Sequence, residues 1–507
     1  MKKLSYRSLL ICVGISMLLF SCSKSYLDTQ PTDQISEDDA FSTVANAQTA
    51  LNGIYRALYM QYASQSEDGL AAMMITMDFM GEDIVHSASG TSYFRNDYKW
   101  VNHRSVSSAL NYFAYRFFYK IIANANMILA NIDGIEGDEG VKKTIKGEAM
   151  AIRGWAHSYL VQLFGSRYDA AAVPNNQWGV PVVTKVTIDP LPRNTVEEVY
   201  TQVVKDLDSA MVLLTNPSSA TNNTHLKLAS VQGIRARVAL TMQSYDTAAK
   251  YASLAKQSYS LMSNTQYLEG FNSLSNPEWM WGANQLANQL PSYGSFFAYM
   301  SANFNSAHTR PNPKKINTKL YTALASTDIR KKLWWDGTTA DEVNFPGVIN
   351  ASTGQPEPTQ VKRAYQHRKY KVKDPSVSVG DIPFMRAAEM HLIEAEALAR
   401  AGKYTDAATA LYTLAVNRNP SYVKSTKTGT ALIDEIMIQR RAELWGEGFR
   451  FLDLKRTNSP LDRSGTGATS TLATVAVTTP IPAGDVRWQF LIPQDEMNVN
   501  PYMIQNP

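Results

Sequence analysis

The sequence predicts a mostly α-helical protein in which packed helix pairs form a scaffold and a loop-rich lobe is inserted between two of the pairs. Three observations predict this fold class. Apolar residues recur at three- and four-residue steps in most segments outside 264–383, as the buried face of a helix requires. Two Ala-rich helix pairs share one sequence pattern. The stretch 264–383 between them has weak periodicity and is rich in Asn, Ser, Gly, Pro and aromatic residues.

The composition excludes several classes of protein. With 44% apolar and 19% charged residues among 507, the chain has ample material for a globular core. A net charge of +4 is too small for a protein that binds nucleic-acid phosphates, so no nucleic-acid partner is expected. Two cysteines cannot build a disulfide scaffold or a cysteine-rich zinc site.

The N-terminus is typical of an exported lipoprotein. Residues 1–21 combine a basic start with a short apolar stretch at 9–20, which is too short to span a bilayer. Leu19-Phe20-Ser21-Cys22 resembles a bacterial lipobox, which makes Cys22 the expected lipidation site; a plain signal peptide is the alternative. Cleavage would remove three basic residues and no acidic one, so the net charge would fall from +4 to +1. The mild basicity is therefore no hint about the ligand.

The first half of the body is expected to be helical. Residues 22–38 are polar and are expected to form a lipidated tether, and helical spacing starts at Asp39. Further helices are expected over 105–133 and 139–164, and the proline-rich stretch 165–193 is expected to be a loop. Thr195 with Glu198 forms a capping box before an apolar stripe that runs to Leu214.

Two later helix pairs, over 229–260 and 387–416, look like copies of one unit. Tyr245-Asp-Thr-Ala248-Ala249 matches Tyr404-Thr-Asp-Ala407-Ala408, and each run follows an Ala-rich helix. Gly402 stands where the turn needs a permissive backbone. The pattern resembles the tetratricopeptide helix–turn–helix, in which small residues let two helices approach closely. Generic packing of Ala-rich helices is the alternative.

The domain organisation follows from these segments. Because a structureless loop of more than a hundred residues is unusual in a compact domain, the variable stretch 264–383 is expected to be a lobe of loops and short elements. Residues 457–490 are expected to be loop or short strands. We therefore expect one α-helical domain over 39–507, with the lobe as an insertion.

No motif for catalysis, a cofactor or a metal is present in the sequence. The chain lacks a phosphate loop, a complete dinucleotide fingerprint and a nucleophile elbow. His391-Leu-Ile-Glu394 does not match a zinc motif, and carboxylate pairs such as Glu82-Asp83 occur by chance among 45 acids. We expect a protein that is not an enzyme and that has no cofactor.

Aromatic residues in irregular segments suggest a platform for a carbohydrate. Flat rings bind the apolar faces of sugars, and polar side chains bind the hydroxyl groups around them. In the lobe the candidates are Trp279, Trp281, Tyr293, Trp334 and Trp335. Before the lobe, the run from Tyr93 to Asn102 mixes rings with polar side chains; there we expect Trp100 to stack, and Asn102, Asp83 and Arg95 to bind hydroxyls. The alternative is that the rings pack beneath their own loops.

Residues 433–456 contain the most specific motif. Arg440-Arg441-x-Glu443-Leu444 is followed by Glu447-Gly448-x-Arg450 and Asp453-Leu454-x-Arg456. The run resembles the signature of the SusD/RagB family of nutrient-binding surface lipoproteins. Other motifs agree in order along the chain: Ala50-Leu51-x-Gly53-Ile54-Tyr55, Gly147-Glu148-Ala149, Leu163-Phe164-Gly165, Ala236-Arg237-Val238-Ala239-Leu240, Glu394-Ala395-Glu396-Ala397 and Asn500-Pro501. In physical terms, the Arg and Glu residues of 433–456 are expected to form a structural lattice of ion pairs between helices.

The resemblance implies a SusD-like fold with four tetratricopeptide-like helix pairs and a variable loop-rich lobe. It implies a lipid-anchored protein of the outer membrane that faces the cell exterior and binds oligosaccharides without hydrolysing them. It also implies a partner, a SusC-like TonB-dependent transporter. The chain departs from the family in one respect, because Ser-Lys-Ser-Tyr-Leu-Asp28 after Cys22 is not an acidic export signal. Three alternatives remain open: peptide binding on the same fold, a periplasmic glycosidase, and a scaffold that binds only proteins.

Overall fold

The computed structural model describes residues 41–507 except 87–92, 215–222, 291–292, 343–346, 349, 351 and 469–474. The expected signal peptide, Cys22 and the tether over 22–38 lie outside the described residues. Among the residues that are described, none of the helices has the length and apolar character needed to cross a membrane.

Helices make up most of the regular structure. The longer ones are α3 (Val44–Ala57), α4 (Gly69–Phe79), α6 (Ala109–Asn131), α7 (Glu139–Phe164), α8 (Val196–Leu213), α9 (Leu228–Thr241), α10 (Tyr245–Ala255), α15 (Ala387–Arg400), α16 (Tyr404–Arg418) and α17 (Gly429–Glu443). Shorter ones are α5 (Arg95–Tyr98), α11 (Asn264–Leu268), α12 (Phe296–Met300), α13 (Thr318–Ala323), α14 (Thr339–Glu342), α18 (Arg450–Arg456) and α19 (Gln494–Val499).

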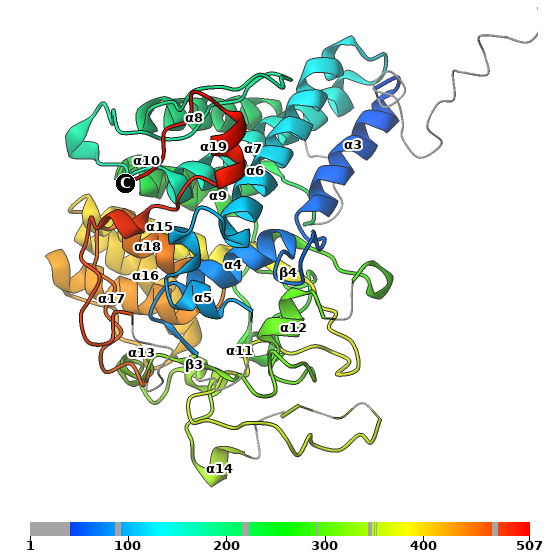
Figure 1. Ribbon diagram of the computed structural model, residues 1–507. Helices are drawn as coiled ribbons and strands as arrows, with labels where there is room; N and C mark the ends of the chain where they lie inside the picture. The colour runs from blue at the N-terminus through cyan, green and yellow to red at the C-terminus, as the bar shows by residue number, and fades with distance from the viewer. Residues whose placement is uncertain are drawn as a thin grey trace, which may run out of the picture.

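The long helices pack one after another into a scaffold. Helix α6 packs on α7, α7 on α8, α8 on α9, and α9 on α10. The two similar helix pairs lie next to each other, because α10 packs directly on α15, which in turn packs on α16 and α17. Units separated by more than a hundred residues are therefore neighbours in space, in the upper half of Figure 1.

The helix ends agree with the sequence signals. The Thr195 hydroxyl accepts from the Glu198 N–H, and the Glu198 carboxylate accepts from the Thr195 N–H at 2.8 Å, which is the predicted capping box. Gly402 has a φ of +79°, as its place in the turn requires, and Gln243 holds the equivalent left-handed position at +59°. The next residues, Ser244 and Lys403, each donate to a carbonyl five residues earlier. This closure is typical of a Schellman turn, so both pairs use the same turn.

The lobe contains short elements, as expected. Strand β2 (Trp279–Ala283) pairs antiparallel with β4 (Ile382–Arg386), which closes the two ends of the insertion against each other. Strand β3 (Lys314–Ile316) pairs with β1 (Ile84–His86), which lies outside the lobe. Helices α11 to α14 lie among its loops, in the lower half of Figure 1. The β1–β3 sheet therefore fastens the lobe to a segment outside it, whereas the β2–β4 sheet holds the two ends of the lobe together.

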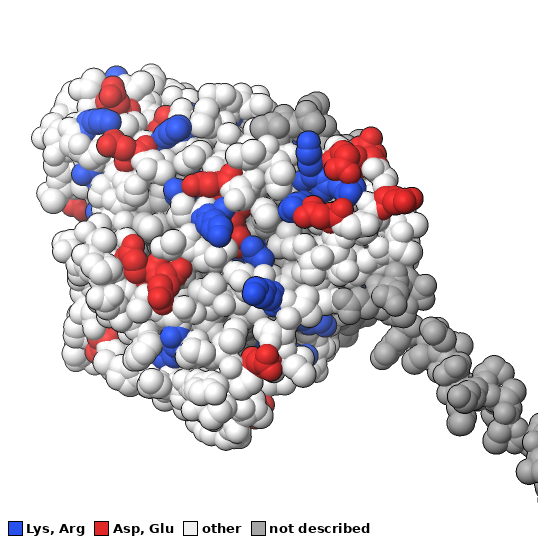
Figure 2. Space-filling model, turned by 90° about the horizontal axis from the view of Figure 1, so that it is seen from above, with Lys and Arg blue, Asp and Glu red and all other residues white. Residues whose placement is uncertain are grey.

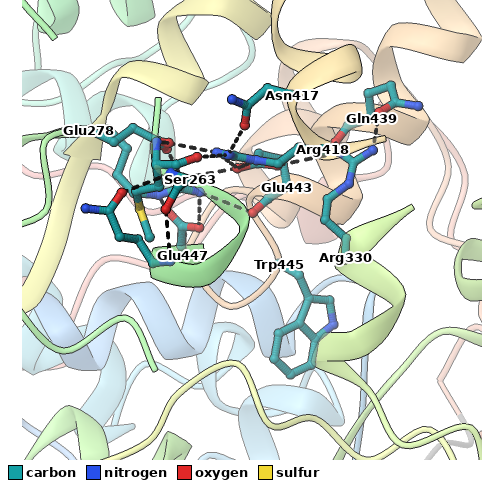
Figure 3. Close-up of polar contacts among 12 residues, drawn as sticks. Ser263, Glu278, Arg330, Asn417, Arg418, Gln439, Glu443, Trp445 and Glu447 are labelled. Atoms are coloured by element: carbon teal, nitrogen blue, oxygen red, sulfur yellow. Dashed lines mark hydrogen bonds and ion pairs between the residues drawn. The ribbon is translucent and has the colours of Figure 1, made fainter. Parts of the chain in front are cut away.

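A buried ion-pair lattice joins the lobe to the scaffold (Figure 3). Glu443 of α17 accepts from Arg418 of α16 at 3.0 Å and from Arg386 of β4 at 3.2 Å. Arg386 also pairs with Glu278, just before β2, and with Glu447 at 2.6 Å. All of these side chains are at least nine-tenths buried. Glu443 and Glu447 of the 433–456 motif thus belong to a lattice that extends into the lobe, and the arginines of the motif form further ion pairs, such as Arg440 with Asp453 and Arg441 with Asp83.

The turn between α17 and α18 makes a second contact between distant segments, because it binds the end of α4. Gly446 and Gly448 both have positive φ, at +81° and +87°. The Asp78 carboxylate, at the end of α4, accepts hydrogen bonds of 3.0 Å from the N–H groups of Gly448, Phe449 and Arg450. Asp78 therefore caps the start of α18 and fixes α4 against the C-terminal helices. The stretch 433–456 is two helices joined by this glycine turn.

Candidate functional site

A hollow of about 400 Å³ opens between α4, α5 and the start of α6. Its wall includes Ser66 and Glu67 before α4, Thr76 on α4, the segment from Tyr93 to Asn102, and Phe113 on α6. Most of the run from Tyr93 to Asn102, which the sequence singled out, therefore lies on one concave surface. The hollow is the candidate functional site.

Two strained residues flank the short helix that carries the polar groups of the hollow. Phe94 and Trp100 have φ angles of +64° and +56°, a region that bulky residues rarely occupy. Each such residue costs roughly 1–3 kcal/mol and persists only where packing holds it in place. Both rings are buried: Phe94 packs edge-to-face on Tyr299, and Trp100 packs edge-to-face on Trp488 at 4.9 Å. The buried rings hold α5 in a fixed position at the wall.

Trp100 is buried in this structure and does not line the hollow, so it presents no exposed face for the predicted stacking. Only 5% of the residue is exposed, and its indole N–H donates to the Met80 carbonyl at 2.8 Å. The positive φ turns the indole inward, away from the hollow that its neighbours line. Trp100 is a positioning residue for α5.

Arg95 and Asn102, two of the residues that were predicted to bind a ligand, both line the hollow. Arg95 has no ion-pair partner within the part of the chain that the structure describes, and its Nε is buried with no hydrogen-bond partner there. The Asn102 amide donates to the Asp97 carboxylate at 2.5 Å. Burial raises the pKa of Asp97 to about 6, although the hydrogen bonds from Asn102 and Thr76 oppose the shift. The hollow therefore combines an unpaired guanidinium with a carboxyl that titrates near neutrality.

Tyr93 is a lining residue that the prediction did not include in the site. Tyr93 is 40% exposed. The centroid of its ring lies 5.1 Å from that of His308 and 6.1 Å from that of Tyr299, and both of these residues belong to the lobe. Tyr93 thus presents a partly exposed ring where the hollow meets the lobe. The mixture of rings and polar side chains from Tyr93 to Asn102 indicated a binding surface in the sequence. The sequence does not indicate which of these rings faces outward.

Asp83 does not face the hollow, and the prediction that it binds hydroxyls is wrong for this conformation. Its carboxylate accepts from Arg441 Nε at 2.9 Å and from Nη2 at 2.5 Å, and only 3% of the residue is exposed. The Trp445 indole donates to its backbone carbonyl at 2.9 Å. Asp83 belongs to the ion-pair lattice that joins β1 to α17.

Three of the lobe tryptophans are core residues and so cannot serve as exposed stacking faces. Trp279 and Trp281 lie on β2, and Trp334 follows a 3₁₀ turn; each is 0% exposed. Trp281 packs edge-to-face on Trp155 of α7, and Trp334 on Trp445 beyond α17. These rings bind the lobe to the scaffold, which is the alternative that the sequence left open.

The other two lobe candidates lie nearer the surface. Tyr293 is 50% exposed, next to Phe304. Trp335 is half-buried, and its indole donates to the Thr338 carbonyl at 2.9 Å. Neither residue lines the hollow at α5. The structure thus brings together Arg95 and Asn102 but none of the five lobe residues.

Metal-ligating groups do not gather anywhere in the described ranges: no three His, Cys, Asp or Glu side chains there could hold one ion. His391 is 8% exposed on α15, where burial lowers its pKa to about 3. A histidine buried in this way is neutral, as a structural residue would be.

Comparison with known proteins shows the family to which this mostly helical fold belongs. Residues 25–240 match a family described as starch-binding and associating with the outer membrane, and residues 242–507 match the SusD family. The chain belongs to the SusD family.

Relatives and solved structures agree over nearly the whole chain. SusD-like protein P38 of Formosa agariphila is 24% identical, over 92% of this chain and 94% of its own. A SusD-like carbohydrate binding protein from Bacteroides vulgatus has a TM-score of 0.77 at 25% identity and covers 91% of this chain and 98% of its own. A SusD superfamily protein from Bacteroides thetaiotaomicron has a TM-score of 0.75 at 23% identity, over 92% of this chain and 100% of its own. The mostly helical SusD-like fold is confirmed.

Proposed function

We propose that this protein captures oligosaccharides in the hollow at α5 and passes them to a transporter, without chemical change. The observation that carries the proposal is Arg95, which lies in the wall of an open, polar hollow of about 400 Å³ and whose guanidinium has no ion-pair partner among the described residues. A guanidinium offers five N–H donors in a planar fork, which suits the oxygen-rich edge of a sugar. Family membership supports the same class of ligand.

The rest of the hollow fits a sugar unit. Tyr93 presents a partly exposed ring for an apolar sugar face, and Asn96, Lys99 and Asn102 add polar groups at the wall. A hydroxyl both donates and accepts, so a mixture of amide, ammonium and carboxyl groups satisfies it. Figure 2 shows that, on the face seen from above, acidic and basic side chains are interspersed on a mostly uncharged surface.

Catalysis is not part of the proposal. A glycosidase needs two carboxyl groups free to face each other across the glycosidic bond. In the hollow, Asp97 accepts from Asn102, and Glu67 accepts from the Ala63 N–H at 3.0 Å, so both carboxyls already bind the protein's own groups. Peptide capture on the same fold is the second candidate, since amide-lined walls also bind a peptide backbone.

The remaining parts of the proposal concern the cell surface. We propose that Cys22 is lipidated, that the protein is held on the outer membrane facing outward, and that its partner is a SusC-like TonB-dependent barrel. The lipobox and the family description support these statements. Labelling with a lipid precursor should mark the wild-type chain and leave Cys22→Ser unmarked. The barrel should co-purify with the wild-type chain from solubilised outer membranes.

One screen tests the cargo and the absence of chemistry together. The full chain in detergent is applied to arrays of glycans and of oligopeptides, and any bound glycan is then incubated with it and analysed for shorter products. We expect retention on glycans only and no products. Retention on peptides alone would favour the second candidate, and product formation would contradict a pure binding role.

A further inference from the structure

A second hollow, of about 220 Å³, lies at the start of the segment that connects α3 to α4. Leu58 and Tyr59, at the start of this segment, line the second hollow, whereas Ser66 and Glu67, at its end, line the first. The two hollows share no lining residue. The second is therefore a separate surface feature.

Segments far apart in the sequence build the second hollow. Its wall comes from α3, from Thr224 and His225 before α9, from Gly282 at the end of β2 and the loop that follows, and from Phe384 of β4. The His225 ring contacts the Tyr55 ring in a tilted arrangement with centroids 4.1 Å apart, and its Nδ1 lies 2.9 Å from the carboxylate of the buried Glu148. Tyr55 donates to the same carboxylate at 2.5 Å. The base of the hollow is therefore rigidly held.

Side chains at the rim of the second hollow have hydrogen-bonding groups that do not bond to the described residues. The Arg56 guanidinium lies over the Tyr59 ring at 4.8 Å and donates to the Gln289 carbonyl at 2.9 Å. The side-chain oxygen of Gln289 is buried and has no partner within the described residues. Asn284 and Asn52 are exposed; Asn284 uses its amide nitrogen on Asp381 at 2.9 Å, and Asn52 uses its oxygen on Gln48 at 3.1 Å. One acceptor on Asn284 and one donor on Asn52 thus remain for a ligand.

The lining selects the class of ligand. None of the residues that line this hollow is Asp or Glu, and three of its polar residues, Asn52, Asn284 and Gln289, carry side-chain amides. Amides that offer both donors and acceptors match hydroxyl groups, which need both. Leu286, 49% exposed, adds an apolar surface for a C–H face.

We infer that this hollow is a second saccharide-binding site, in which Asn52, Asn284 and the Gln289 side chain bind the hydroxyls of one or two sugar units. The class of ligand rests on the proposed function; the location rests on the hollow itself. A binding protein with two sites gains avidity for a glycan chain that offers repeated units and that can reach both sites at once.

The loop supplies a matched control for the test. Asn284-Gln285-Leu286 is repeated as Asn288-Gln289-Leu290, and Asn288 is exposed but does not line the hollow. Isothermal titration of the full chain in detergent uses maltotriose, cellotriose, xylotriose and mannotriose as probes. The variants are Asn284→Ala, Asn52→Ala on α3, Tyr93→Ala in the first hollow, and Asn288→Ala.

We expect at least one trisaccharide to bind. Asn284→Ala and Asn52→Ala should each weaken its affinity for one site at least fivefold, and Asn288→Ala should leave that affinity unchanged. Asn52→Ala removes no contact with the lobe, so it separates ligand binding from a disturbed loop. Binding that Tyr93→Ala weakens, and that neither asparagine variant alters, would overturn the second site and leave the proposed function standing. No binding of any probe would count against both.

Discussion

Glu443 is the residue on which the buried ion pairs converge. Its carboxylate receives Arg418 and Arg386, and Arg330 lies at 3.5 Å. Burial alone would raise the pKa of Glu443, but the three guanidinium groups outweigh it and hold the pKa well below the usual range. The carboxylate therefore stays ionised at any ordinary pH, and the charges of the lattice remain matched.

Removing that charge is expected to be costly. Glu443→Gln removes one negative charge from the buried lattice, so that Arg386, Arg418 and Arg330 keep only their other carboxylate partners, which costs about 3–5 kcal/mol of unfolding free energy. Urea denaturation measures the loss. The control is Glu139→Gln, where an exposed carboxylate pairs with Lys142 at 2.9 Å and where a change below about 1 kcal/mol is expected. Equal effects of the two variants would contradict the role of Glu443.

Asp97 gives the candidate site a pH dependence. Because burial raises its pKa from 3.8 to about 6, the unfolded chain releases this proton first as the pH rises. The free energy of unfolding therefore decreases between about pH 4 and pH 6 because of Asp97, and it stays lower by this amount above pH 6. In Asp97→Asn the titration is absent, so the stability of the variant relative to wild type should rise by about 2–3 kcal/mol from pH 4 to pH 7. Urea denaturation of both proteins at the two pH values checks this, and a pH-independent difference would contradict it.

At the scale of elements, the glycine turn between α17 and α18 allows a close approach. A Cβ on Gly448 would lie 2.6 Å from the Cα of Met74 on α4, a backbone contact that cannot be relieved by rotating a side chain. Gly402, also at positive φ, has open space around such a Cβ. The two glycines thus separate backbone strain from packing.

The expected costs differ accordingly. Gly402→Ala should lose about 1–2 kcal/mol from the left-handed backbone alone. Gly448→Ala should lose a further 1–3 kcal/mol, because α4 and the turn must move apart. Thermal denaturation of both variants checks the difference, and equal melting temperatures would show that the α4 contact yields without cost.

The sequence patterns predicted helices with one apolar face and missed a helix buried on every side. Helices α7 and α8 have mixed apolar and polar faces, and their bounds agree with the patterns. Every residue of α4 is buried, so its sequence has no periodic stripe to detect. Likewise, β2 is buried on both faces, and nothing in its sequence distinguishes a core tryptophan from a binding one. The location of Arg95 in the hollow follows from the backbone strain at Phe94 and Trp100, which no local pattern reveals.

At the scale of the whole molecule, the ion-pair lattice and the tryptophan contacts make the lobe part of the scaffold. Glu278 and Arg386 of the lobe ends share partners with Arg418 and Glu443 of the helices. We therefore predict that the residues from 41 to 507 unfold as one unit, with a single calorimetric transition whose calorimetric and van 't Hoff enthalpies agree. Two separated transitions would show that the lobe is an independent domain.

The central claim is that the hollow at α5 binds the glycan through Arg95. The most direct measurement is the affinity of the full chain for a glycan that the array identifies, compared between Arg95→Ala and Arg116→Ala. Arg116 is an exposed arginine of α6 that does not line the hollow, so it matches the change in charge. Since a hydrogen bond to a charged group contributes about 1.5–3 kcal/mol, we predict at least tenfold weaker binding for Arg95→Ala and unchanged binding for Arg116→Ala. An unchanged affinity in Arg95→Ala, with the fold intact, would contradict the claim.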